Sequence, residues 1–370
     1  MSKAFDTKII ETESLWDTLA LSHIPVVLYG MGDGAVKLLS ILKKRGITPV
    51  GIFASDEFVR YNSFCGYTVK KLSDIEEEFR DFIVLVAFAT HLDTVREHIF
   101  EISKKHTLFI PDINVTGDPL EVFDKAFFNE NRHRLEAVYD RLDTDRSKNM
   151  FAALVNFKLS GKLYYLEEIE RYRQEDTLPY DAAQIESFAD LGAYNGDTLN
   201  EAFNTYPNLK KAVCFEPDPK TFKKLKETAN ALPVDTKTVN ALAHNENTEL
   251  ELYAASGRNT VVKKQAYSNA SMQKKKSVLV GALRPDSVTD FVPHLIKMDV
   301  EGCEMQALEG CEGFFKEHSP ILRISIYHNN RHLFEIAEKL ERIKKGYKLA
   351  ISQKCTYIPA WDIELVAYNS

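Results

Sequence analysis

The sequence predicts an α/β protein built from two doubly wound domains that are joined by a helical segment. Short apolar stretches alternate with helical stretches in two separate parts of the chain, and each series opens with a strand that runs into a glycine turn. Between the two series, Leu, Phe and Tyr recur at helical intervals. At 370 residues the chain also exceeds the usual size of one domain. We therefore expect domains at residues 1–118 and 184–370 and a helical connector at 119–183.

The composition is that of an ordinary globular protein, with 44% apolar and 27% charged residues. A net charge of −7 argues against a phosphate backbone as partner, so we expect no nucleic acid. Acidic Asp6 and Glu11 stand where a signal peptide would carry basic residues, and no apolar run approaches membrane-spanning length. Five scattered cysteines suit neither a zinc site nor a closed disulfide framework. We expect a cytoplasmic protein without a membrane partner.

The first series resembles a Rossmann-like unit. An apolar strand at 24–29 leads into the turn Gly30–Gly34 and a helix at 36–44, and further strands are expected at 49–53 and 81–88. Glycines at a helix N-terminus let an anion approach the backbone, which would suit a nucleotide or sugar nucleotide. Close packing of the strand against its helix requires the same glycines, and the sequence leaves both interpretations open.

The second series contains more strands and an insertion. The insertion carries apolar stretches at 249–253 and 277–282, which we expect to form an added hairpin. In an open α/β sheet the ligand lies at the carboxyl ends of the strands, so the residues that follow each strand are the candidates for function. The expected strands are 188–191, 212–215, 238–242, 295–298, 321–327, 347–352 and 364–368.

Three strand ends carry residues that can bind a ligand. Small residues after the first strand let a ligand approach the backbone, and Asp190 and Asp197 can hold a cationic amino-acid group. Glu216 after the second strand can accept both hydroxyls of a ribose. This acid-rich loop suits the cationic sulfonium of S-adenosylmethionine better than a pyrophosphate, so we expect S-adenosylmethionine as cofactor, although both aspartates are also typical turn and cap residues. The expected cofactor contacts are Asp190, Gly192, Ala193, Tyr194, Asn195, Gly196, Asp197, Thr198, Glu216, Pro217, Asn240, Ala241 and Asp299.

The fourth strand leads into Lys297-Met-Asp-Val-Glu-Gly-Cys-Glu304, with Leu308 and Gly310 beyond. Together with Asp190-Leu-Gly-Ala and Glu216-Pro, this run resembles the FkbM-type methyltransferases over residues 185–370. The resemblance implies a class I methyltransferase fold. It also implies methyl transfer, commonly to a hydroxyl oxygen of a sugar, a polysaccharide or another glycan, or a small metabolite, and it does not identify the acceptor.

Methyl transfer chiefly requires that donor and acceptor are aligned and water is excluded. For a hydroxyl acceptor, Asp299 and His328 are candidate general bases, and His328 matches the strand-end histidine of the family it resembles. The alternative is a histidine that is merely satisfied at the sheet edge. Lys297 would orient the acceptor or pair with the neighbouring carboxylates. The candidate substrate contacts are Glu301, Tyr180 and Ser271.

Two alternatives and one open point accompany this hypothesis. Asp299, Glu301 and His328 form an oxygen-rich set of the kind that binds divalent cations, but no spacing rule demands an ion and we expect none. A non-catalytic protein that binds nucleotides or partners on two Rossmann-like domains is the second alternative, although intact Asp190 and Glu216 argue against it. The sequence is compatible with a homo-oligomer and does not determine the oligomeric state.

Overall fold

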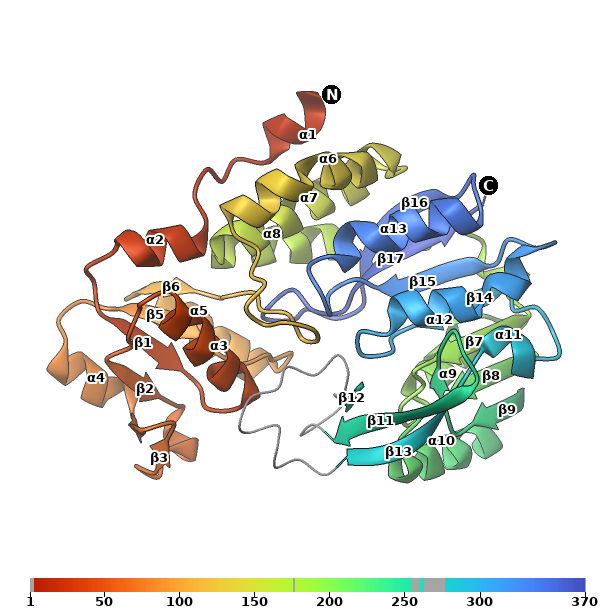
Figure 1. Ribbon diagram of the computed structural model, residues 1–370, viewed down its shortest axis with the longest axis horizontal. Helices are drawn as coiled ribbons and strands as arrows, with labels where there is room; N and C mark the ends of the chain where they lie inside the picture. Colours follow the sequence, from red (N-terminus) through yellow and green to blue (C-terminus); the bar gives the residue numbers. More distant parts are fainter. Residues whose placement is uncertain (1–2, 176, 255–259, 263–276, 370) are drawn as a thin grey trace.

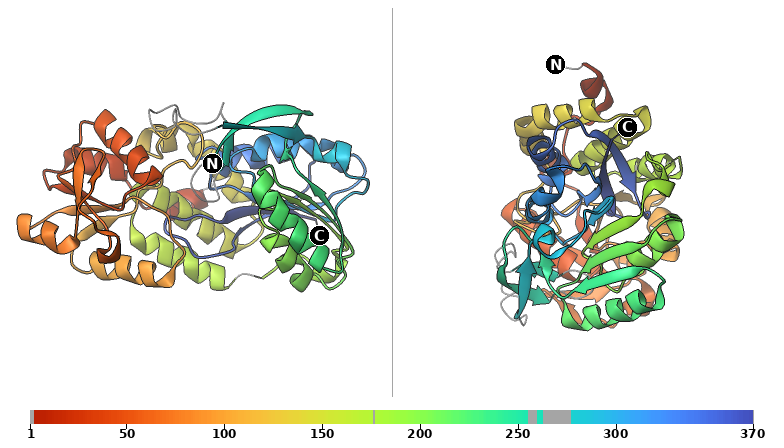
Figure 2. Two further views of the ribbon diagram at one scale, coloured as in Figure 1. Left: turned by 90° about the horizontal axis from the view of Figure 1, so that it is seen from below. Right: turned by 90° about the vertical axis from the view of Figure 1, so that its right-hand side faces the viewer.

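The computed structural model describes residues 3–175, 177–254, 260–262 and 277–369. Figures 1 and 2 show two lobes along the long axis, the first red to orange and the second green to blue. Each lobe contains one large sheet flanked by helices, which confirms the predicted α/β class and its two doubly wound sheets. Among the described residues, no helix combines the length and hydropathy needed to cross a bilayer.

The first sheet has the strand order β3-β4-β2-β1-β5-β6 and is parallel except for the β3–β4 pair. The expected strands at 24–29, 49–53 and 81–88 correspond to β1, β2 and β5, whereas the short β3, β4 and β6 were not predicted. The strands are β1 (Val26–Tyr29), β2 (Gly51–Phe53), β3 (Ser63–Phe64), β4 (Tyr67–Lys70), β5 (Ile83–Val86) and β6 (Thr107–Phe109). The helices are α1 (Lys3–Lys8), α2 (Leu15–Leu21), α3 (Asp33–Lys44), α4 (Leu72–Glu78) and α5 (Asp93–Ser103).

The first glycine turn is tightly packed. Gly30 has a φ of +109°, and a Cβ there would overlap the ring of Phe88. A Cβ on Gly34 would overlap the carbonyl oxygen of Ala87. Close approach of the β1–α3 turn to the segment after β5 therefore accounts for two of the three glycines without a ligand. A nucleotide at Gly30–Gly34 stays a prediction.

Three helices follow the first sheet in the sequence and cover one edge of the second sheet: α6 (Lys125–Arg141), α7 (Asp145–Ser160) and α8 (Leu163–Gln174). The backbone amide of Asp143, before α7, donates to the carbonyl of Leu349 in edge strand β16 over 2.8 Å. Ser147 Oγ accepts from the amide of Ile351, and the Arg146 guanidinium donates to the carbonyl of Ile351. These bonds satisfy edge groups that would otherwise be open to another strand.

The second sheet has the order β16-β17-β15-β14-β7-β8-β9, in which β17 is antiparallel to both neighbours. Its strands are β7 (Ser187–Leu191), β8 (Lys211–Phe215), β9 (Asp235–Val239), β14 (Leu295–Met298), β15 (Ile321–Ser325), β16 (Lys348–Gln353) and β17 (Ile363–Tyr368). Its helices are α9 (Asp197–Thr205), α10 (Pro219–Ala231), α11 (Pro285–Val288), α12 (Glu304–Gly310) and α13 (His332–Ile343).

The insertion forms a small sheet of four strands rather than a hairpin alone: β10 (Leu242–Ala243), β11 (Thr248–Ala254), β12 (Thr260–Val262) and β13 (Ser277–Leu283). The expected pairing of 249–253 with 277–282 is present as the antiparallel β11–β13 pair. The expected strand at 238–242 corresponds to β9 but was placed too late, because the chain leaves the large sheet after Val239 and joins β13 through β10. The Asn240 amide donates to the carbonyls of Glu216 and Pro217 and fixes this change of direction.

Candidate functional site

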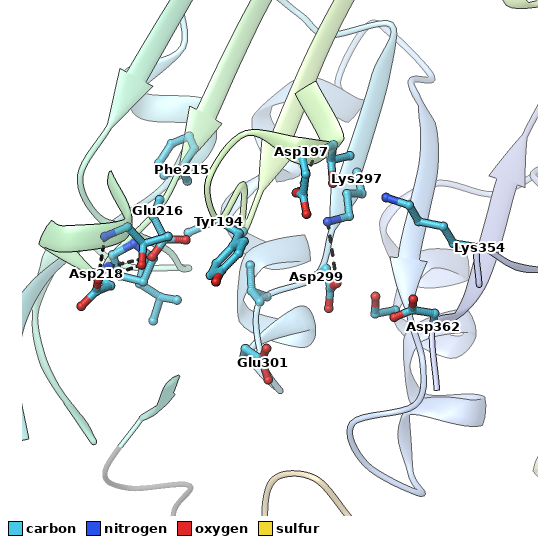
Figure 3. A pocket seen from close by; sticks show the side chains of 18 of the residues that line it. Tyr194, Asp197, Phe215, Glu216, Asp218, Lys297, Asp299, Glu301, Lys354 and Asp362 are labelled. Atoms are coloured by element: carbon cyan, nitrogen blue, oxygen red, sulfur yellow. Dashed lines mark hydrogen bonds and ion pairs between the residues drawn. The ribbon is translucent and has the colours of Figure 1, made fainter. Parts of the chain in front are cut away.

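A cavity of about 390 Å³ opens at the carboxyl ends of β7, β8 and β14. Its size falls within the range of small-molecule sites, roughly 300–1,000 Å³. Figure 3 shows Tyr194 and Glu216 on one side, Lys354 and Asp362 on the other, and Asp299 between them. The predicted cofactor contacts in its wall are Gly192, Tyr194, Asp197, Thr198, Glu216, Pro217, Ala241 and Asp299.

The remaining predicted cofactor contacts support the wall from behind. Ala193 is fully buried in the core, and Asn195 accepts from the amide of Asp197 while its carbonyl accepts from Thr228. Gly196 caps the N-terminus of α9 with a φ of +87°. Asp190 is fully buried and outside the cavity lining, and the Asn240 side chain is bonded to the turn after β8.

Gly192 brings the ends of β7 and β14 together. Its φ is +96°, and a Cβ on it would overlap the carbonyl oxygen of Asp299. The amides of Gly192 and Ala193 both donate to the carbonyl of Phe215, at 3.1 and 2.8 Å. Only glycine allows this combination of backbone angle and close approach, so the glycine of the motif sets the shape of the cavity floor.

Glu216 places a carboxylate at the cavity beside the first turn of α10. One carboxylate oxygen accepts from the amide of Asp218 over 2.8 Å, and Asp218 in turn caps α10 at Lys220 and Thr221. The residue is only 7% exposed. Burial raises the pKa of Glu216 to about 7, so the carboxyl changes charge near neutral pH.

Lys297 lies between two carboxylates. Its Nζ is 3.7 Å from Asp190 Oδ1 and 3.7 Å from Asp299 Oδ2. Burial raises the pKa of Asp190 to about 6 in spite of the lysine. Burial would lower the pKa of Lys297, but Asp190 and Asp299 outweigh it and raise that pKa above its usual range. Lys297 is therefore a charged partner of both carboxylates and also borders the cavity.

His328 lies beneath the cavity wall rather than in it, and its ring is fully buried. Nδ1 is 3.0 Å from Glu304, and Nε2 is 3.4 Å from Glu301 and 3.6 Å from Asp299. Burial would lower the pKa of His328, but Glu304 and Glu301 outweigh it and raise the pKa well above its usual value. Because His328 does not line the cavity, its role as a general base stays a prediction.

Tyr180 and Ser271 do not contribute to the described wall. The Tyr180 hydroxyl lies 3.0 Å from the Tyr206 hydroxyl in a buried cluster, and Tyr180 is outside the cavity lining. Ser271 lies outside the described residues. Glu301, the third predicted substrate contact, does line the cavity.

Sequence reasoning missed the opposite wall, which contains His91, Lys354, Tyr357 and Asp362. His91 belongs to the first lobe, and the neighbouring Thr90 exchanges two backbone hydrogen bonds with Ile358, at 2.8 and 2.9 Å. Burial and the charge of Asp299 raise the pKa of Asp362 to about 6. No local motif indicates these residues, because chain segments far apart in sequence bring them together.

Backbone strain is present on both sides of the cavity. Tyr194, Glu301 and Asp362 have φ values of +48°, +52° and +57°. Residues other than glycine rarely adopt this left-handed region. All three line the cavity. Strained residues of this kind cluster at ligand and catalytic sites because the surrounding structure must hold them in place.

Comparison with known proteins finds a family match in the C-terminal part of the chain. The family described as "Methyltransferase FkbM domain" matches residues 190–357. Methyltransferase FkbM from Methylobacillus flagellatus KT is similar over 99% of this chain and 98% of that chain, with 20% identity and a TM-score of 0.69. At that identity it shows the fold, which is a class I methyltransferase fold with an added sheet. No curated protein matches.

Two more distant structures are also methyltransferases by name. Precorrin-6y C5,15-methyltransferase from Geobacter metallireducens GS-15 has 12% identity and a TM-score of 0.31 over 55% of this chain and 88% of that chain. An O-methyltransferase family protein from Burkholderia thailandensis has 11% identity and a TM-score of 0.31 over 66% and 70%. The family match and the motifs at the cavity agree, and residues 190–357 of this chain carry an FkbM methyltransferase domain.

Proposed function

We propose that the protein transfers a methyl group from S-adenosylmethionine to a hydroxyl oxygen of a sugar, a glycan or a small metabolite. The observation that carries the proposal is the convergence of Gly192, Glu216 and Asp299, from three separate motifs, on one cavity. The family supports methyl transfer. We add to it S-adenosylmethionine as the methyl donor and a hydroxyl oxygen as the acceptor.

The chemistry of one cavity wall fits the donor. Gly192 leaves the backbone open to close approach, and the Glu216 carboxylate can accept the two hydroxyls of a ribose. Asp197 at the start of α9 and Asp299 make this wall acidic, which suits a zwitterion with an additional sulfonium charge. When bound, S-adenosylmethionine supplies a methyl group that the sulfonium has already activated.

The opposite wall fits the acceptor. Asp362 and Lys354 face Asp299 across the cavity, and His91 and Tyr357 add polar and aromatic surface. The Asp362 carboxylate would take the hydroxyl proton as the oxygen–methyl bond forms and the sulfur–methyl bond breaks. In this proposal the first lobe takes part in acceptor recognition through His91.

Donor binding is expected to strengthen as pH rises from about 6 to about 8, since the Glu216 carboxyl has a pKa of about 7 and accepts hydroxyls best when ionised. The folding stability of the free protein changes in the opposite direction with pH. Because the pKa of Glu216 is raised in the folded state, ionising Glu216 lowers the stability, and hydrogen bonds to the donor can recover this loss. Calorimetric titration with S-adenosylhomocysteine at several pH values measures this, and Glu216→Gln should flatten the profile.

Asp362→Asn is expected to lower kcat about 100-fold, the size typical of a lost general base, with little change in the KM for the donor. The fall of kcat toward acidic pH, centred near the Asp362 pKa of about 6, should disappear with it. Steady-state kinetics across pH measure both effects. Asp290→Asn, a change at an exposed aspartate outside the cavity wall, is the matched control and should leave kcat unchanged.

His91→Ala is expected to raise the KM for the acceptor several-fold, about the loss of one hydrogen bond, without changing donor affinity. The physical reason is its position in the cavity lining, where its ring lies 5.1 Å from the ring of Tyr357. An unchanged acceptor KM would remove the first lobe from acceptor recognition.

Transfer of a labelled methyl group tests the function itself. The full chain is incubated with labelled donor and panels of monosaccharides, oligosaccharides and hydroxylated small molecules, and the products are analysed for O-methyl ethers. Label in an O-methyl product supports the proposal. Donor binding without turnover across the panels would instead support the non-catalytic alternative.

A further inference from the structure

A compact cluster of carboxylates surrounds the imidazole of His328 at the base of the cavity. Single ligand atoms of Asp299, Glu304 and His328 lie within 4.8 Å of one another. Nε2 of His328 also lies 3.4 Å from Glu301 Oε2. The residues come from the loop after β14, the start of α12 and the loop after β15, so three segments of the second lobe converge here.

The imidazole is not satisfied by hydrogen bonds. His328 is fully buried, and neither ring nitrogen has a hydrogen-bond partner of acceptable geometry among the described residues. The buried Oε2 atoms of Glu301 and Glu304 also lack such partners. The Nε2 atom of this buried ring lies 3.4 and 3.6 Å from two carboxylates. Buried polar atoms without hydrogen bonds lower the stability of a protein.

The cluster also carries excess negative charge. Asp299, Glu301 and Glu304 lie near one another, with Lys297 beside Asp299 and His332 Nδ1 3.3 Å from Glu304 Oε2. Even a protonated His328 leaves carboxylates in excess. Burying unbalanced charge is unfavourable unless a counter-charge accompanies it.

The two sides of the imidazole differ. Nδ1 faces Glu304, whose Oε1 already accepts from the amides of Val300 and Gly302 at 3.0 and 3.3 Å. Nε2 faces Asp299 and Glu301, which both line the cavity. A carboxylate on the far nitrogen of a metal-binding histidine fixes the ring and its tautomer. Glu304 occupies that position, and the Nε2 side is the one open to an ion from the cavity.

The distances are close to those of a metal site. Metal–ligand bonds of about 2.1 Å place adjacent ligand atoms about 3.0 Å apart in an octahedron. The distances of 3.4 and 3.6 Å from His328 Nε2 to the Glu301 and Asp299 carboxylates exceed this value by only a few tenths of an ångström. Glu301 has a strained φ of +52°, and Glu304, which fixes the ring, holds the amides on either side of Glu301.

We propose that His328 Nε2, Asp299 and Glu301 form a site for a divalent cation of the Mn²⁺ type, with Glu304 orienting the imidazole. Carboxylates select against soft ions, and the imidazole favours a first-row transition metal over Ca²⁺. The ion would lie at the cavity wall, where it can hold an acceptor hydroxyl and lower its pKa. The site itself does not depend on the proposed methyl transfer.

Direct binding of Mn²⁺ to the chelator-treated full chain tests this site, with electron paramagnetic resonance as the readout and neither donor nor acceptor present. The expected result is one bound Mn²⁺ per chain with a nitrogen coupling from the histidine. Asp299→Asn and Glu301→Gln should each weaken binding at least about tenfold, and Glu304→Gln should do so about 10- to 100-fold through the ring orientation. His328→Gln should remove the nitrogen coupling.

His244→Gln changes a partly buried histidine outside the cluster and is the matched control, with Mn²⁺ binding expected to stay unchanged. Because His328→Gln removes a fully buried ring and can disturb folding, Glu301→Gln at a 22% exposed side chain keeps the test decisive. Absence of bound Mn²⁺ in the wild type, or equal affinity in wild type and Glu301→Gln, would overturn the site. Neither outcome bears on whether the donor binds.

Discussion

Gly192→Ala is expected to cost about 3–5 kcal/mol of stability and to abolish binding of S-adenosylhomocysteine. The left-handed backbone at φ +96° costs an alanine about 1–3 kcal/mol, and overlap with a rigid backbone adds a comparable amount. The atom that a Cβ would meet is the Asp299 carbonyl oxygen, so the ends of β7 and β14 would have to separate. Urea unfolding measures the first effect and calorimetry the second.

Gly346→Ala is the matched control for this change. Gly346 has a similar φ of +94°, but no atom lies within 4 Å of a Cβ placed there. It should therefore show only the backbone cost of about 1–3 kcal/mol and keep full donor affinity. Equal effects of the two substitutions would mean that the contact between Gly192 and Asp299 does not shape the cavity.

Lys297→Met is expected to destabilise the protein by about 3–5 kcal/mol at pH 8, because it leaves the fully buried Asp190 without its cation. Asp190 already has a pKa raised to about 6, above the usual value of an aspartate, so the folded state prefers its protonated form. The penalty is fully present when Asp190 is ionised and shrinks as pH falls through its folded-state pKa. Thermal unfolding of both proteins between pH 5 and 8 measures this slope.

Adding Asp190→Asn to Lys297→Met should recover part of the lost stability, since the double variant has no unpaired charge on the Asp190 side. The coupling energy from the four proteins isolates the pair from the effects of each side chain alone. Additive effects would contradict the assignment of Lys297 as the partner of Asp190.

The donor side of the cavity could be predicted from the sequence because its residues are local. A glycine turn after a strand and a Glu-Pro pair after the next one place Gly192 and Glu216 at adjacent strand ends, wherever the rest of the chain lies. Asn240 was less predictable. It ends a strand as expected, but its amide bonds the backbone near Glu216 and turns the chain into the inserted sheet.

The acceptor side could not be predicted in the same way. His91 reaches the cavity through the backbone pairing of Thr90 with Ile358, a contact that no local pattern encodes. The environment of His328 is a similar case. Its place at a strand end was predictable, whereas its burial against Glu304 depends on how α12 packs.

Calorimetric titration of the full chain with S-adenosylhomocysteine tests the central claim, that the cavity binds the methyl donor through Glu216. We expect one binding event per chain in the wild type. Binding to Glu216→Ala should be at least about tenfold weaker, because the charged hydrogen bonds to the ribose are lost. Glu227→Ala, on the exposed face of α10, should match the wild type. No binding by the wild type, or undiminished binding by Glu216→Ala, would contradict the account.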